Sequence, residues 1–228
     1  MGYWICVAFI SLLEVRYRIT IRERNRNFLK LLERVTTRLE AAGIKYWLDW
    51  GTLLGAVRDG AIMEHDTDVD VSVTIDQAAG LRAVSDWGGL EIQFFEGTAR
   101  IVPAPHPWLS TIQDLSLLEI TFVDPQSPHL MPLRSVEVEN RAYPAPRDPQ
   151  AYLLRRYGYL GKACVHLGRN RYRACDSWLD YVGYLWNRLV FYRAYFLWKG
   201  TPMPAWLRKL AEGISGATYP RLISTPKT

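Results

Sequence analysis

Three aspartates separated by single residues, Asp66, Asp68 and Asp70, close the stretch GTLLGAVRDGAIMEHDTDVDVSV (residues 51–73). Valines alternate with them, which indicates a half-buried strand whose side chains point to opposite faces in turn. Alternate carboxylates on a strand stand about 7 Å apart at their Cα atoms and can converge on one divalent ion. Without a counter-charge they repel one another and tend to hold protons. The spacing therefore predicts a Mg²⁺ or Mn²⁺ site on the face that carries Asp68 and Asp70, joined by Asp66 if the strand starts early.

The residues before these aspartates are of the types that hold a phosphate group. Gly51 allows close approach of the backbone, and Thr52 offers a hydroxyl and opens a short helix, whose first N–H groups attract anions. Arg58 adds a forked donor for phosphate oxygens. The order of strand, Gly-Thr helix and acidic strand therefore predicts a metal-bound phosphate.

The surrounding patterns predict the elements that position this site. A helix is expected over 16–42, strands at 44–50 and 67–73, and between them a short helix that ends at Gly60. Further along we expect a helix at 76–87 capped by Asp76, a strand pair around the turn Glu96-Gly97, a loop at 103–109 and a strand at 115–124. The apolar stripe of the first helix consists of Phe28, Leu31, Leu32, Val35 and Leu39. This order is typical of an α/β or α+β enzyme core.

The C-terminal third begins with YPAPRDPQAYLLRRYG (residues 143–158), which predicts a loop and then a helix with Asp148 as its N-cap. A basic run follows, and it is either a solvated cationic surface or a site for an anionic glycan or nucleotide. Residues 177–199 predict a long aromatic helix. Core packing is the favoured interpretation of that helix, and contact with a membrane surface is the alternative. The basic run consists of Arg155, Arg156, Lys162, Arg169, Arg171 and Arg173.

The composition is that of a globular protein with a net charge of +5. This charge fits an anionic partner such as a nucleotide, a phosphoglycan or a membrane surface, and is too small to indicate nucleic acid. The apolar residues 1–15 are shorter than the roughly 20 residues of a membrane span and lack a basic leader, so we expect a buried strand or the first turns of a helix; a truncated or degenerate signal-anchor is the alternative. Cys6, Cys164 and Cys175 form no disulfide framework; free thiols are expected, and a Cys164–Cys175 bridge stays open.

The stretch WGTLLGAVRDGAIMEHDTDVDV (residues 50–71) resembles the signature of the LicD family, phosphotransferases of the nucleotidyltransferase superfamily that include fukutin and fukutin-related protein. Residues 143–158 are similar to a second family segment, a loop containing proline and a helix that ends in Tyr-Gly. The sequence departs from the family at Glu64-His65, where Pro-Trp is usual, and at Thr67, which replaces an aspartate. His65 is either a phosphate or metal contact, or a surface or packing residue.

The resemblance implies an α+β fold, with a nucleotidyltransferase-like mixed sheet flanked by helices, an N-terminal helix and C-terminal helices. We divide the chain into an N-terminal segment and helix (1–43), a catalytic core (44–160) and a C-terminal helical extension (161–228). By resemblance, Gly51 and Thr52 hold phosphate. Asp68 and Asp70 hold the metal with Glu119 as the third carboxylate.

The resemblance also implies an activity: transfer of a phospho-alcohol, such as phosphocholine or ribitol phosphate, from a CDP-activated donor to a glycan. Glu119, or else Asp66, then receives the acceptor proton, while Arg58, Arg155 and Arg156 hold substrate phosphates. No zinc and no nucleic acid are expected. The compartment is cytoplasmic for a bacterial source and the Golgi lumen for a eukaryotic one, and the oligomeric state stays open. Two alternatives stay open: a nucleotidyltransferase acting on the α-phosphate of an NTP, and a non-catalytic binding subunit on the same fold.

Overall fold

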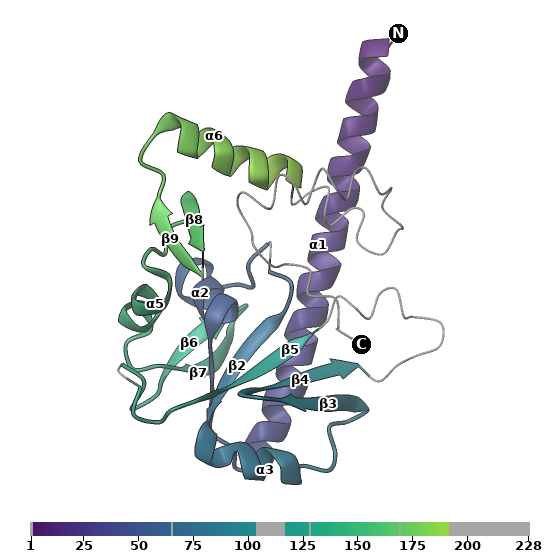
Figure 1. The fold of residues 1–228 in the computed structure, drawn as a ribbon. Coiled ribbons are helices and arrows are strands. Elements are labelled where there is room, and N and C mark those ends of the chain that lie inside the picture. Colours follow the sequence, from purple (N-terminus) through teal and green to yellow (C-terminus); the bar gives the residue numbers. More distant parts are fainter. Residues whose placement is uncertain (1, 65, 104–116, 128, 169, 192–228) are drawn as a thin grey trace. The chain divides into compact units, whose positions relative to one another are not determined.

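The computed structural model describes residues 2–64, 66–103, 117–127, 129–168 and 170–191 (Figure 1). The chain forms two compact units. The larger unit comprises residues 18–153, and the smaller unit comprises residues 1–17 together with 154–228. The predicted division at residues 43 and 160 stays a prediction.

Helix α1 (Gly2–Ala41) opens the chain. Of the two predictions for the N-terminal segment, a strand or the first turns of a helix, the structure therefore has the helix. The predicted apolar stripe is confirmed, because each of its five side chains is at most 4% exposed. The helix ends before Gly43, whose φ of 69° lies in the left-handed region that favours glycine.

Five strands of the described chain form a mixed sheet in the order β1-β2-β5-β4-β3. The strands are β1 (Tyr46–Leu48), β2 (Val69–Thr74), β3 (Leu90–Phe95), β4 (Thr98–Pro103) and β5 (Leu118–Val123). Strands β2 and β5 run parallel, and the other neighbouring pairs are antiparallel. The predicted α+β class with a mixed sheet flanked by helices is confirmed.

Two local predictions about β2 and its surroundings were wrong. All six residues of β2 are buried, so the strand is covered on both faces and is not half-buried. The helix predicted at 76–87 is the 3₁₀ turn η1 (Ile75–Gln77) followed by α3 (Ala78–Ala83). Asp76 lies within that turn and is not its N-cap, which is Thr74.

The larger unit also contains a second helix, a hairpin and the beginning of a further helix, which continues into the smaller unit. Helix α2 (Trp50–Asp59) ends at Gly60 as predicted, with a φ of 64°. Strands β6 (Arg134–Val138) and β7 (Arg141–Ala145) form a hairpin, so the predicted loop at 143 begins inside a strand. Helix α5 (Pro149–Tyr157) has the predicted cap, because the Asp148 carboxylate accepts a hydrogen bond from the Ala151 amide at 3.0 Å. The loop expected at 103–109 lies almost wholly outside the described residues.

The smaller unit contains the hairpin of β8 (Cys164–Gly168) and β9 (Arg171–Ala174), helix α6 (Trp178–Trp186) and the π-helical turn η2 (Asn187–Phe191). The aromatic helix begins where predicted, with Ser177 as its N-cap, but none of the residues of α6 is buried. Core packing was therefore the wrong interpretation for α6. Cys164 and Cys175 form no disulfide bond, as expected. In the part of the chain that the structure describes, no helix is long and apolar enough to span a membrane.

Candidate active site

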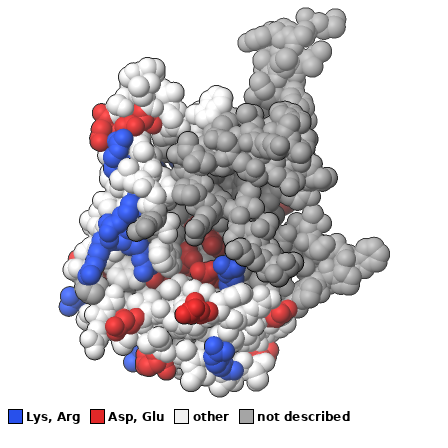
Figure 2. Space-filling model, viewed as in Figure 1, with Lys and Arg blue, Asp and Glu red and all other residues white. Residues whose placement is uncertain are grey.

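The predicted aspartates meet at the beginning of β2. Asp70 is the second residue of the strand, whereas Asp66 and Asp68 lie in the segment just before it. The alternation of side chains along a strand therefore accounts for the position of Asp70 alone. Asp70 is in register with Glu119 on the parallel strand β5. Figure 2 shows acidic side chains gathered near the centre of one face, with a basic side chain beside them.

The cluster carries more negative charge than its surroundings neutralise. Burial raises the pKa of Asp70 well above its ordinary value, and the charges of Asp68, Asp66, Asp49 and Glu119 raise it further. Burial and the neighbouring Asp68 likewise raise the pKa of Asp66 to about 8. The Oδ2 atom of Asp66 is buried without a hydrogen-bond partner. A buried carboxylate of this kind is unfavourable unless a cation or a proton joins it.

Gly51 is required by the position of Asp66. A Cβ atom built on Gly51 would lie 2.5 Å from Oδ2 of Asp66, closer than real side chains approach. The absence of a side chain at Gly51 thus makes room for the Asp66 carboxylate. The predicted close approach at Gly51 is to a carboxylate of the chain itself, and phosphate contact there stays a prediction.

Replacing Gly51 with Ala should displace the Asp66 carboxylate and lower activity about tenfold to 100-fold, because small misplacements in a site have effects of that size. The unfolding midpoint should change little, since a side-chain end can move aside. Gly80→Ala is the matched control, because its new Cβ would meet its nearest neighbour at 4.0 Å. Turnover and thermal unfolding of both variants check this. Equal activity of the two variants would show that the space left by Gly51 for the Asp66 carboxylate does not affect catalysis.

Thr52 acts on Asp70 in the structure. It is fully buried in α2, and its hydroxyl oxygen accepts a hydrogen bond from the Asp70 amide at 2.8 Å. The prediction that Thr52 opens the helix was wrong, because α2 begins at Trp50 and Asp49 is its N-cap. The Thr52 hydroxyl therefore fixes the start of β2, and its contact with a phosphate stays a prediction.

Asp49 is the residue that sequence reasoning missed. Its Oδ1 accepts a hydrogen bond from the Trp50 amide at 2.7 Å. Its Oδ2 accepts hydrogen bonds from the hydroxyls of Ser72 at 2.6 Å and Tyr152 at 3.0 Å. One fully buried carboxylate thus joins β1, α2, β2 and α5. Its only sequence signal is local, since aspartate is a preferred N-cap immediately before a helix.

Arg24 and Asn25 of α1 hold the segment that leads to Asp66. The buried Arg24 guanidinium donates hydrogen bonds to the carbonyl oxygens of Glu64 at 2.6 Å and Met63 at 3.3 Å. The Asn25 amide donates to the Ile62 carbonyl at 3.3 Å. Arg24 also opposes the rise of the Asp66 pKa. Helix α1 therefore positions the site as well as filling the core.

Glu119 has a basic partner on the neighbouring strand. Arg100 on β4 is in register with Glu119, and its Nε donates to Oε2 at 3.0 Å. The Glu119 side chain is 24% exposed, whereas Asp70 beside it is buried. The structure therefore brings Glu119 beside Asp70, as predicted, and Oε2 of Glu119 accepts a hydrogen bond from Arg100.

Of the predicted basic ligands, Arg58 lies away from the aspartates, and the contacts of Arg155 and Arg156 with substrate phosphates stay predictions. Arg58 lies in the last turn of α2, at the opposite end from Gly51, and pairs with Asp59 at 2.9 Å. Arg155 and Arg156 lie in the last turn of α5 and belong to the smaller unit. His65 lies outside the described residues.

The acidic cluster suits a hard cation by its donor chemistry. Within the described ranges, no three His, Cys, Asp or Glu side chains form a ready-made metal site. Mg²⁺, however, usually takes one or two carboxylates and fills its other positions with water and substrate phosphates. Burial and neighbouring negative charges raise the pKa values of Asp66 and Asp70, and Oδ2 of Asp66 has no hydrogen-bond partner. Both features fit the binding of a cation together with a substrate phosphate.

The segment that contains the three aspartates matches a model of a nucleotidyltransferase domain. Residues 43–97 match the family model described as LicD/FKTN/FKRP, nucleotidyltransferase domain. The predicted resemblance to the LicD family is therefore confirmed over this segment, which includes Gly51 and the three aspartates.

Two curated relatives and two solved structures are similar to the chain. Ribitol 5-phosphate transferase FKRP from Mus musculus and from Homo sapiens are each 53% identical over 38 residues, which are 17% of this chain and 8% of the relative. Lincomycin-bound lincosamide antibiotic adenylyltransferase LnuA aligns with a TM-score of 0.40 and 14% identity, over 68% of this chain and 95% of its own. Antibiotic-resistance factor ANT(2'')-Ia aligns with a TM-score of 0.35 and 14% identity, over 85% and 91%.

Proposed function

We propose that the chain transfers a phospho-alcohol from a CDP-activated donor to a glycan hydroxyl, with a divalent cation at the acidic cluster. The observation that carries this is the acidic cluster, whose aspartates lie within the segment that matches the LicD domain. Similarity to a ribitol 5-phosphate transferase supports a phospho-alcohol transferase in general. The choice of a CDP donor and a glycan acceptor rests on the resemblance described above.

In this proposal the acceptor hydroxyl oxygen attacks the phosphorus that carries the alcohol. A new O–P bond forms, the bond from that phosphorus to the bridging oxygen of the diphosphate breaks, and CMP leaves with the electron pair. The hydroxyl proton passes to a carboxylate, for which Glu119 is the first candidate and Asp66 the second. Asp68 and Asp70 would hold Mg²⁺ or Mn²⁺, which supplies charge neutralisation on the diphosphate when bound.

The neighbouring residues keep these carboxylates in place. The Thr52 hydroxyl holds the Asp70 amide, and the space left at Gly51 admits Asp66. Arg24 holds the backbone just ahead of Asp66. Such fixed positions raise the rate, because the groups need no rearrangement as charge develops.

Product analysis tests the proposal against a nucleotidyltransferase that uses an NTP. The protein is incubated with Mn²⁺ and either CDP-choline, CDP-ribitol or CTP, and the products are separated by ion exchange. We expect CMP from a CDP-alcohol and no pyrophosphate from CTP. Pyrophosphate from CTP without CMP from either CDP-alcohol would assign the site to nucleotidyl transfer. No product with any donor, together with no Mn²⁺ binding, would favour the non-catalytic subunit.

A further inference from the structure

Helix α6 of the smaller unit exposes a stripe of large apolar side chains. Trp178 is 73% exposed, Leu179 66%, Val182 45% and Trp186 54%. At about 100° per residue, these four positions fall within one side of the helix. Single exposed apolar residues are ordinary on a protein surface, but a continuous stripe marks an interaction site.

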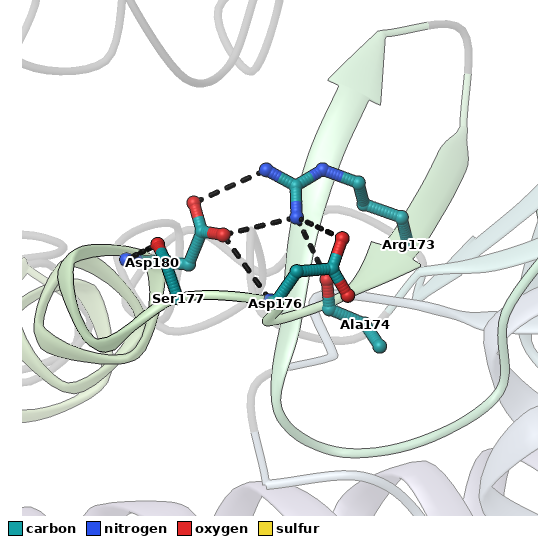
Figure 3. A network of polar contacts seen from close by, with 5 residues as sticks. All are labelled: Arg173, Ala174, Asp176, Ser177 and Asp180. Carbon is teal, nitrogen blue, oxygen red and sulfur yellow. Dashed lines mark hydrogen bonds and ion pairs between the residues drawn. The ribbon is translucent and has the colours of Figure 1, made fainter.

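The polar side of α6 is bound to the β8–β9 hairpin, as Figure 3 shows. Asp180 accepts hydrogen bonds from both terminal nitrogens of Arg173, at 3.0 and 3.1 Å, and one from the Asp176 amide at 3.2 Å. Trp178 and Val182 each lie two residues from Asp180, which is about 200° around the helix. The hairpin therefore holds α6 by one side and leaves the apolar stripe on the other.

The same part of the chain is rich in positive charge. Residues 154–191 include seven Lys or Arg and two Asp, an excess of five, whereas residues 1–153 contain 15 Lys or Arg and 20 Asp or Glu. Figure 2 shows basic side chains gathered over α5 and the β8–β9 hairpin. Arg155 and Arg171 are exposed members of this group.

We propose that the smaller unit binds the surface of an anionic lipid membrane, with the α6 stripe at the level of the head groups. Tryptophan and leucine on one side of a helix are typical of helices that lie in this interface. Nearby basic residues are attracted to anionic lipids. A second copy of the chain fits less well, because a two-fold contact would bring the two basic surfaces together. This inference is independent of the proposed catalytic function.

Flotation of the full chain with lipid vesicles tests the proposal. We expect binding to phosphatidylcholine vesicles that contain phosphatidylglycerol, weaker binding to phosphatidylcholine alone, and weakening with added salt. Trp178→Ser with Trp186→Ser should lower binding at least tenfold. Ile75→Ser is the matched control, since Ile75 is 61% exposed in the larger unit and should float like the wild type.

A second variant, Lys162→Gln with Arg171→Gln, tests the charge contribution without touching α6. We expect it to lose the preference for anionic vesicles, and circular dichroism shows whether each variant is folded. Absence of vesicle binding by the wild type would overturn the proposal. So would a dimer that forms with rising concentration and is lost in the tryptophan variant, because the stripe would then join two copies.

Discussion

Asp70→Asn is expected to abolish catalysis while the fold survives. The backbone amide of Asp70 donates a hydrogen bond to the Thr52 hydroxyl, and a change of the Asp70 side chain leaves this hydrogen bond in place. A bound cation supplies several kcal/mol of transition-state stabilisation, and losing about 4 kcal/mol corresponds to roughly 1,000-fold in rate. Because the folded protein raises the pKa of this carboxyl, the neutral amide removes repulsion, and the unfolding midpoint at pH 7 should be equal or higher.

The measurement is kcat/KM for CMP release beside thermal unfolding. Asp76→Asn is the matched control, because Asp76 is an exposed aspartate in η1 and its variant should keep wild-type turnover. Turnover of Asp70→Asn within a few-fold of the wild type would show that Asp70 has no essential role in catalysis.

Asp49→Ala is expected to produce the largest loss of stability. It leaves the Trp50 amide and the hydroxyls of Ser72 and Tyr152 without their acceptor in the interior. Each buried donor left unsatisfied costs about 1–3 kcal/mol, so the free energy of unfolding should fall by about 3 kcal/mol or more.

Two conservative variants separate the contacts of Asp49. Ser72→Ala and Tyr152→Phe each remove one donor and should each cost about 1 kcal/mol, the typical net value of a hydrogen bond. Denaturant unfolding of the three single variants and of Ser72→Ala with Tyr152→Phe gives the coupling between them. If Asp49→Ala unfolded no more easily than Ser72→Ala, the carboxylate would not be the centre of this network.

Predictions that depended on local signals were largely confirmed by the structure. The spacing of Phe28, Leu31 and Leu32 predicted the buried side of α1, and glycine in the left-handed conformation ended α2 at Gly60. The Asp148 cap and the turn at Glu96-Gly97 also follow from residues only a few positions apart. Such features need no knowledge of the rest of the chain.

The remainder depends on distant partners. Asp49 meets Ser72 and Tyr152, which are 23 and 103 positions away, and no local pattern pairs them. The alternation of residue types around Asp70 predicted a half-buried strand. Strand β2 instead lies between β1 and β5 in the sheet, and all of its residues, including Asp70, are buried. The contact of Arg24 with the segment before Asp66 crosses 40 positions and was likewise hidden.

The most direct test of the central claim is CMP release from CDP-choline and CDP-ribitol by protein that has been stripped with EDTA, before and after Mn²⁺ is returned. We predict no release from the stripped protein, recovery with Mn²⁺ for the wild type and for Asp76→Asn, and no recovery for Asp70→Asn. Release that persists in EDTA, or that Mn²⁺ restores equally to Asp70→Asn, would contradict a divalent cation held by this acidic cluster.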